Sequence, residues 1–135
     1  MPILTTLRRR KTWPFNAMSE TLDRMGKPRD AIGWESKART LYRAIEVKNP
    51  GSLDTATNDA ASLLHFGSLE AKLGLRAAAA KDLGEARDVL QRQVTQSPKN
   101  RPIQDLYQQA ARLAASAKQR PDGETRDSNP VPPIL

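Results

Sequence analysis

Two segments of this chain, 48 residues apart, have closely similar sequences. Residues 36–50 read SKARTLYRAIEVKNP, and residues 84–98 read GEARDVLQRQVTQSP. A small alanine one turn before a bulky apolar residue is typical of a helix that packs closely on a neighbour, and a proline marks where such a helix stops. A repeat of this length therefore predicts stacked helical hairpins. The matching positions are Ala38 with Ala86, Arg39 with Arg87, Tyr42 with Leu90, and Pro50 with Pro98.

The size and composition of the chain limit its architecture. Its 135 residues are enough for one folded domain with a modest core. Only 4% of the residues are aromatic, so the core must be built mainly from Leu, Ala, Ile and Val. The lack of cysteine excludes disulfides, thiolate nucleophiles and most structural zinc sites. The longest apolar run is far shorter than the roughly 20 residues of a membrane-spanning helix, so we expect a soluble or peripheral protein with no transmembrane segment.

The spacing of apolar residues predicts an all-α fold of about five helices, arranged as antiparallel hairpins in a short array. The first helix is expected to begin with Ser19 as its N-cap and to stop at Gly26. The second begins at Pro28, a residue suited to the first position of a helix, and ends before Pro50. These two helices form the first hairpin.

The third and fourth helices are expected to form the second hairpin. The third is capped by Ser52 or Asp54 and runs toward Gly74. Asp82 and Glu85, three residues apart, resemble a capping box and predict the start of the fourth helix, which ends at the proline of the second repeat copy.

The fifth helix starts at Asn100 and Pro102 and has the clearest helical spacing, and the segment beyond it is rich in proline and polar residues. The chain is therefore divided into three regions. We expect a basic extended arm at residues 1–18, a helical-hairpin domain at 19–117, and a Pro-rich extended or disordered tail at 118–135.

The formal charge of +7 is concentrated at the start of the chain, because residues 1–18 contain four basic residues and no acid. Such an arm is interpreted as a segment that lies on an acidic surface, as an organelle-targeting segment, or as a solvated chain end. The cytoplasm is the favoured location, with a mitochondrion or other organelle as the alternative. The residues that would carry the function of the arm are Arg8, Arg9, Arg10, Lys11 and Trp13.

The two repeat copies resemble the tetratricopeptide-type (TPR-like) helical repeats. The second helix of that family has a small residue, a bulky apolar residue four positions later and a proline eight beyond that, and both copies have this spacing. Leu73-Gly74 is similar to the Leu-Gly pair of the family's first helix, and residues 25–31 resemble its inter-helix turn. The resemblance covers roughly residues 19–117 and implies an array of hairpins that binds partners.

Three features depart from the family pattern. The repeat of 48 residues exceeds the usual 34 or so. Glu70 and Ala77 stand at the aromatic positions of the first helix, and the later alanine of the second helix is Ile45 in one copy and Gln93 in the other. The resemblance therefore implies a divergent array with long repeats.

The tripeptide Leu41-Tyr42-Arg43 also occurs in the mitochondrial LYR assembly factors. Those proteins carry it at the head of their first helix, whereas here it lies late in a helix that ends at Pro50. We therefore interpret Tyr42 as a core residue and Arg43 as solvent-facing.

Residues for catalysis are not evident. His65 is the only histidine, and the nearest acids in the sequence, Asp59 and Glu70, lie six and five residues away. Neither separation brings two side chains onto one face of a helix. We therefore expect no pocket in which His65 meets an acid, no metal site, no cofactor and no enzymatic activity.

The favoured function is a non-enzymatic scaffold or assembly subunit, which binds other protein subunits through the first helices of its hairpins and through its extended ends. The alternative is a basic, ribosome-associated protein that places its arm on nucleic-acid phosphates. The candidate partner-binding residues, chosen by position on and after the third helix, are Asn58, Ser62, His65, Lys72 and Arg76.

Overall fold

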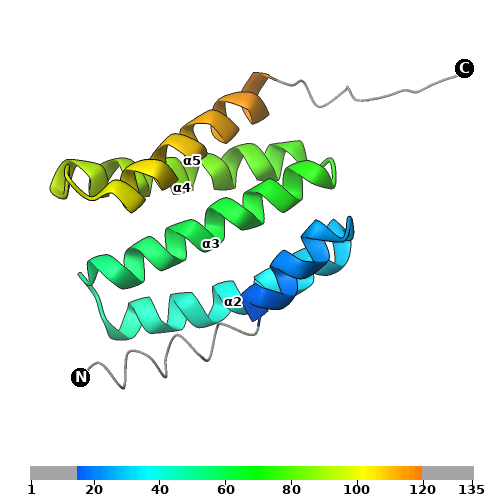
Figure 1. Cartoon of the computed structure of the whole chain (residues 1–135), viewed down its shortest axis with the longest axis horizontal. Helices are drawn as coiled ribbons and strands as arrows, with labels where there is room; N and C mark the ends of the chain where they lie inside the picture. The colour runs from blue at the N-terminus through cyan, green and yellow to red at the C-terminus, as the bar shows by residue number, and fades with distance from the viewer. Residues whose placement is uncertain (1–14, 120–135) are drawn as a thin grey trace, which may run out of the picture.

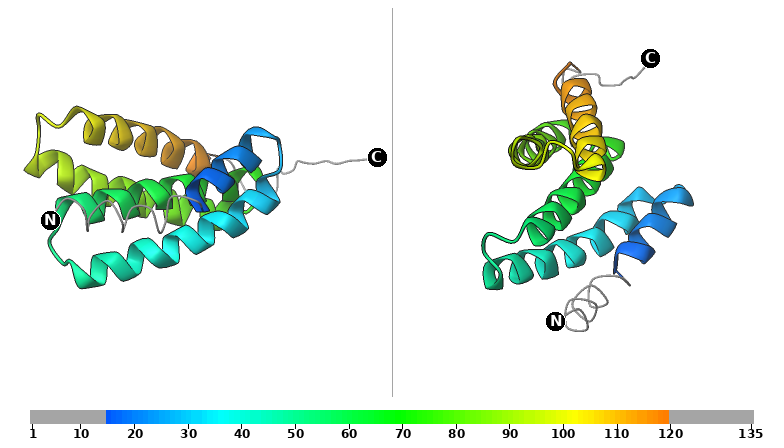
Figure 2. Two further views of the ribbon diagram at one scale, coloured as in Figure 1. Left: turned by 60° about the horizontal axis from the view of Figure 1, so that its bottom comes forward. Right: turned by 60° about the vertical axis from the view of Figure 1, so that its left-hand side comes forward.

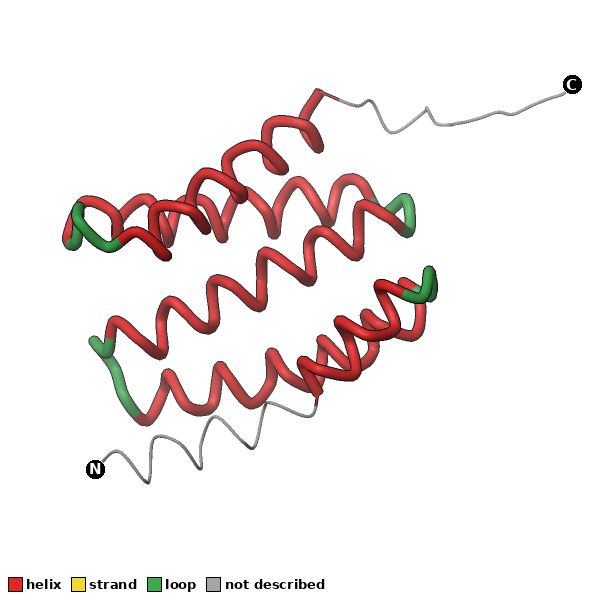
Figure 3. The backbone as a smooth tube through the Cα atoms, viewed as in Figure 1, coloured by secondary structure: helices red, strands yellow, loops and turns green. Residues whose placement is uncertain are grey.

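A computed structural model of the protein describes residues 15–119, and every regular element in this range is a helix (Figure 3). The all-α prediction is therefore confirmed. Residues 15–24 form a helix that we call the N-terminal helix. The other four helices are α2 (Pro28–Lys48), α3 (Leu53–Lys72), α4 (Arg76–Gln96) and α5 (Arg101–Gln119).

Helix α3 lies in the middle of the array, between α2 and α4 (Figure 1). Helix α5 packs mainly on α4 and also touches α3, and the N-terminal helix turns back against the start of α2 (Figure 2). The turns between helices are only a few residues long, so consecutive helices are antiparallel. Among the described residues, no helix is both long enough and apolar enough to cross a membrane.

The 48-residue repeat of the sequence is also a repeat of the backbone. Helices α2 and α4 each have 21 residues, and both the first and the last residue of α4 lie 48 positions after those of α2. The turns before them contain Gly26 and Gly74, which have nearly equal positive φ angles of 77° and 79°. This left-handed conformation favours glycine and ends the preceding helix in each hairpin.

The helix caps repeat in the same way. Ser52 accepts a hydrogen bond from the backbone N–H of Thr55 (3.4 Å), and Asn100 accepts one from the backbone N–H of Ile103 (3.2 Å). The two capping residues are again 48 positions apart, and each satisfies an N–H group that the first turn of its helix leaves without a partner. Of the two caps predicted for the third helix, Ser52 and Asp54, the structure shows Ser52, and Asn100 caps α5 at the predicted start of that helix.

Two predicted helix starts are wrong. Ser19 does not cap the N-terminal helix but lies inside it and is fully buried, and residues 15–18, assigned above to the arm, are helical. Asp82 does not start α4, which begins six residues earlier at Arg76. The alanines at 77–80 favour a helix, and the left-handed Gly74 ends α3 just before them, so α4 starts as soon as the turn is complete.

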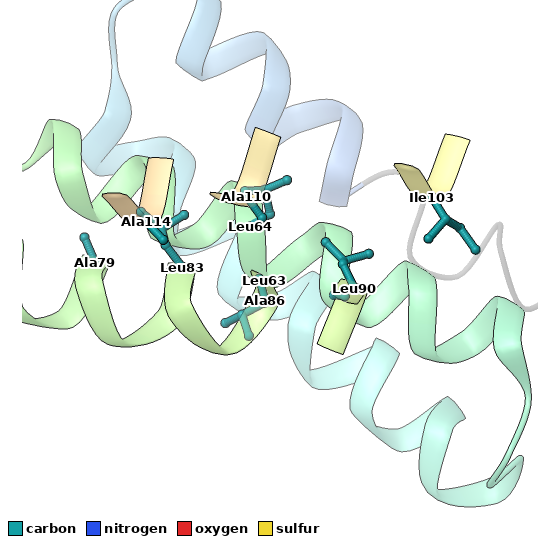
Figure 4. Packing of buried hydrophobic residues seen from close by; sticks show 10 residues of the cluster. Leu63, Leu64, Ala79, Leu83, Ala86, Leu90, Ile103, Ala110 and Ala114 are labelled. Carbon is teal, nitrogen blue, oxygen red and sulfur yellow. The ribbon is translucent and has the colours of Figure 1, made fainter. Parts of the chain in front are cut away.

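The main apolar cluster joins α3, α4 and α5 (Figure 4). Its small residues let the helices approach, and its leucines fill the space between them. Within the described part of the chain, its buried residues include none from the N-terminal helix or from α2. They are Ala60, Leu63, Leu64, Ala79, Leu83, Ala86, Leu90, Ile103, Ala110 and Ala114.

The first hairpin, formed by the N-terminal helix and α2, is built from a different mixture of contacts. Ala31 and Ala38 of α2 are fully buried, and Phe15 packs on Trp34 with ring centroids 5.8 Å apart. The remaining buried residues of this hairpin are polar, namely Ser19 and Glu35. The first hairpin therefore joins the array with less apolar burial than the second.

Gly67, rather than Gly74, is the glycine at which two helices approach closely. A Cβ atom built on Gly67 would lie 2.8 Å from Cγ and 2.9 Å from Cδ2 of Leu83, whereas one on Gly74 would meet nothing within 4 Å. The Leu73-Gly74 pair therefore forms the turn and is not the close-approach pair that the family resemblance implies.

We predict that Gly67→Ala destabilises the protein by about 1–3 kcal/mol, because the added methyl group forces α3 and α4 apart. Gly33→Ala is the matched control, since Gly33 lies in α2 with open space around its Cβ position. It should gain about 0.5–1 kcal/mol from helix propensity. Urea unfolding followed by circular dichroism measures both, and equal stability of the two variants would contradict the packing described for Gly67.

Candidate functional site

A polar hollow of about 120 Å³ lies between the N-terminal helix, α2 and α3. Three helices contribute to its lining, so the site exists only when the first hairpin is docked on α3. We call it the polar hollow. The lining residues are Asn16 and Glu20 of the N-terminal helix, Glu35 and Tyr42 of α2, and Asn58, Ala61, Ser62 and His65 of α3.

Glu35 is the most deeply buried charged group of the polar hollow, with only 2% of its side chain exposed. Ser62 donates a hydrogen bond to its Oε2 atom at 2.6 Å. The other carboxyl oxygen, Oε1, has no hydrogen-bond partner and lies 3.7 Å from Nε2 of His65. This contact is an ion pair only when His65 is protonated. Burying a carboxylate oxygen without a donor costs free energy, so packing alone does not account for a glutamate here.

The acid beside His65 contradicts the prediction that this histidine meets none. Spacing within one helix could not reveal Glu35, because it comes from α2 and reaches His65 across the helix interface. The sequence did contain one signal, namely that glutamate occupies a position whose counterpart in the repeat, Leu83, is apolar.

The geometry around His65 differs from a nucleophile–base–acid triad. A hydrogen bond of 3.2 Å joins Ser19 Oγ to Nε2 of His65, and Glu35 Oε1 approaches the same nitrogen. In a triad the hydroxyl and the carboxylate lie at opposite ring nitrogens of the histidine. The carboxylate orients the ring, and the hydroxyl gives its proton to the other nitrogen. Ser19 is also fully buried, so the arrangement presents no nucleophile to a substrate.

A second hollow, of about 160 Å³, lies between α3, α4 and α5. Three of its lining residues are the 48-residue counterparts of residues in the polar hollow. Ser68 corresponds to Glu20, Leu83 to Glu35, and Leu113 to His65. The fold thus builds the same position twice, once with charged and polar side chains and once with mostly apolar or small ones.

The candidate partner-binding residues are divided between different places. Asn58, Ser62 and His65 line the polar hollow. Lys72 lies farther along α3 and pairs with Asp23 of the N-terminal helix at 2.6 Å. Arg76 begins α4 and lines the second hollow, so it does not join the others.

The basic arm residues Arg8, Arg9, Arg10, Lys11 and Trp13 lie outside the described residues.

Tyr42 and Arg43 point to different surroundings. Tyr42 lines the polar hollow, where it is half-buried and its hydroxyl accepts a hydrogen bond from Asn16 Nδ2. The prediction that Tyr42 is a core residue is therefore wrong. Arg43 is exposed, as expected, and lies 3.9 Å from Asp59 and 3.9 Å from Glu85.

A third hollow, of about 420 Å³, lies between α2 and α3 and is lined by Ser36, Arg39, Thr40, Arg43 and Phe66. Arg39 reaches Asp59 at 3.3 Å and lies over the ring of Phe66. A hydrogen bond with Asp59, together with burial, raises the pKa of Glu46. Both arginines at this surface therefore lie beside acids, Arg39 beside Asp59 and Arg43 beside Asp59 and Glu85.

Glu70 is the second buried acid with an oxygen that lacks a partner. Burial, and then a hydrogen bond and charge repulsion with Asp82 of α4, raise the pKa of Glu70 to about 8. The carboxyl group is therefore protonated in the folded protein at neutral pH. Within residues 15–119, no three side chains of the His, Asp or Glu types gather as they would around a metal ion.

Comparison with models of known protein families, with curated proteins and with solved structures found no match to this chain.

We predict that Ser62→Ala destabilises the protein by about 1–3 kcal/mol, because it leaves both oxygens of the buried Glu35 carboxylate without a hydrogen-bond donor. Ser68→Ala, on the same helix, is the control and should change stability by less than about 0.5 kcal/mol. Urea unfolding at pH 7 distinguishes the two, and equal effects would show that the hydrogen bond to Glu35 contributes little.

The raised pKa of Glu70 predicts a loss of stability with increasing pH. The folded protein retains a proton that the unfolded chain releases above its ordinary pKa of 4.5, so the free energy of unfolding falls as the pH rises from 4.5 to about 8. Glu70→Gln removes this ionisation and should be about 1–3 kcal/mol more stable than the natural protein at pH 8 and similar to it at pH 4. Unfolding measured across this range tests the expectation.

Glu85→Gln is the matched control for Glu70→Gln, because Glu85 lies in α4 with about half of its side chain exposed. It should leave the pH dependence nearly unchanged. A Glu70→Gln protein with the same pH profile as the natural one would contradict the raised pKa.

Proposed function

We propose that this protein is a non-enzymatic interaction or assembly subunit that binds another protein through the face formed by the N-terminal helix and α3. The observation that carries the proposal is the polar hollow, which brings Asn58, Ser62 and His65 together at a surface opening between two hairpins. A binding surface of this kind needs polar groups of fixed position, and the packed helices hold these three side chains in place.

The contrast between the two hollows supports this proposal. The second hollow demonstrates that the same position can be filled with leucine and serine. The polar residues of the first hollow are therefore not required by the hairpin architecture. Residues that cost stability without a structural need are candidates for function, because functional sites are where local rules of folding are broken.

The backbone repeat supports a divergent, TPR-like array. With Gly67 taken as the glycine of close approach, Leu63, Phe66 and Gly67 have the spacing of the W-x2-L-G segment of the family. Ala79 and Leu83 then have the spacing of its A-x3-F segment. The 48-residue repeat and Glu70, at the family's tyrosine position, remain departures from that pattern.

Such arrays stack hairpins into an extended surface and bind peptides or helices on one side of it. The two hairpins and α5 of residues 15–119 offer a short surface, which suits an accessory subunit of a larger assembly. The lack of a triad geometry around His65 and Ser19 agrees with a binding role.

The alternative is binding to nucleic acid through the Arg-rich arm. The helical part of the chain adds to the basic charge, because residues 15–119 contain 16 Lys and Arg against 12 Asp and Glu. Binding of this kind depends steeply on salt, whereas binding in the polar hollow should not.

The proposal is tested in two steps. The partner is first identified by affinity purification of the tagged full chain from its native source and mass spectrometry. Its affinity for purified variants is then measured by calorimetry. Asn58→Ala/His65→Ala should weaken binding at least tenfold, because it removes two polar groups from the hollow. The control Gln108→Ala/Gln109→Ala, on the exposed side of α5, should bind like the natural protein.

A different result would favour the nucleic-acid alternative. If the hollow variant binds normally, while replacement of all four basic arm residues by glutamine abolishes binding and salt weakens it steeply, the hollow is not the binding site. The melting temperature of each variant separates loss of binding from loss of folding.

A further inference from the structure

We propose that the polar hollow receives the cationic end of a lysine or arginine side chain from the bound partner, with Glu35 as its counter-ion. This inference rests on the proposed function and specifies the chemistry that the hollow recognises. It makes Glu35 the residue that selects the partner and the other lining residues the frame that holds the cation in place.

The charge of the hollow is the first argument. Its eight lining residues include two carboxylates, Glu20 and Glu35, and no lysine or arginine. The chain as a whole carries a formal charge of +7. A negative, partly enclosed site on a basic protein attracts cations and repels anionic ligands, because a buried carboxylate interacts more strongly with an opposite charge than an exposed one does.

The unpartnered oxygen of Glu35 is the second argument, and it is independent of the first. Oε2 is occupied by Ser62, but Oε1 accepts no hydrogen bond although it is buried. His65 lies too far from Oε1, at 3.7 Å, for a good hydrogen bond. An ammonium or guanidinium group supplies the N–H donor that Oε1 lacks, and a charged donor bonds a carboxylate more strongly than a neutral one.

The size of the hollow decides which part of a partner enters. A volume of about 120 Å³ holds the end of one side chain and excludes a strand or a helix. The rest of the partner must then lie across the N-terminal helix and α3. Asn16 and Asn58 at the lining have amide oxygens that can accept the remaining N–H groups of the cation.

The second hollow indicates that this chemistry is specific to the first. Leu83 and Leu113 stand where Glu35 and His65 stand in the polar hollow, so a cation in the second hollow would meet no carboxylate among its lining residues. The protein therefore contains an internal reference site with the same architecture but without the proposed counter-ion.

The test uses n-butylguanidinium and n-butylammonium chlorides as probes and n-butanol as the neutral control. Each is titrated into the ¹⁵N-labelled full chain at constant ionic strength, and amide shifts are followed by NMR. We expect the cations to shift the amides of Ser62 and His65 and of the residues around Asn16, and butanol to leave them unchanged. Glu35→Gln should weaken cation binding at least fivefold.

The properties of Glu35→Gln and of two further variants keep the test independent of folding. Glu35→Gln retains an acceptor for the Ser62 hydroxyl, and its melting temperature should remain close to that of the natural protein. Ala61→Leu fills the hollow without changing a charge and should also abolish probe binding. Glu85→Gln, a loss of the same charge at an exposed site on α4, should bind the probes like the natural protein.

Three outcomes would overturn the inference. Equal binding of the cations to the natural protein and to Glu35→Gln would exclude Glu35 as the counter-ion. Equal shifts with butanol would exclude recognition of charge. Markedly tighter probe binding after replacement of Arg8, Arg9, Arg10 and Lys11 by glutamine would identify the chain's own arm, rather than a partner, as the occupant.

Affinity measurements with the partner that the purification identifies distinguish this inference from the proposed function. If it binds Glu35→Gln with unchanged affinity but binds Asn58→Ala/His65→Ala weakly, the cation site is wrong and the interaction surface stands. If both variants bind the partner normally, the proposed function itself fails.

Discussion

The close approach of α3 to α4 is the contact on which the rest of the array depends. Gly67 has no side chain, and Leu83 occupies the space that a Cβ atom would need. Around this point the buried alanines and leucines of α3, α4 and α5 form the main apolar cluster. Because α3 is fixed in this way, it provides a rigid surface on which the first hairpin docks and forms one wall of the polar hollow.

The first hairpin uses the same architecture with different chemistry. Its buried alanines, Ala31 and Ala38, keep the close helix contacts, but Ser19 and Glu35 take the positions of Gly67 and Leu83. Apolar burial that stabilises the second hairpin is therefore partly exchanged for hydrogen bonds and charge contacts, which contribute less net stability. A repeat array allows this exchange, because each hairpin depends mainly on its neighbours.

A buried acid lies at each of the two interfaces of α3, Glu35 at the interface with α2 and Glu70 at the interface with α4, but their surroundings differ. Glu70 lies against another acid, Asp82, so its carboxyl group holds a proton at neutral pH. Glu35 instead faces a serine hydroxyl and a histidine beside an open hollow. The first arrangement makes stability depend on pH, and the second leaves a buried carboxylate oxygen without a hydrogen-bond donor in the lining of the polar hollow.

The sequence by itself determined the all-α fold, the 48-residue repeat and most helix ends, because apolar spacing, prolines, glycines and caps act through neighbouring residues. It misplaced the start of α4, since Asp82 and Glu85 fit a capping pattern that the helix-favouring alanines before them override. It identified Asn58, Ser62 and His65 as candidates but not Glu35. Only the tertiary structure brought Glu35 to His65, because their contact joins residues 30 positions apart on two helices, and no local pattern records which faces of two helices meet.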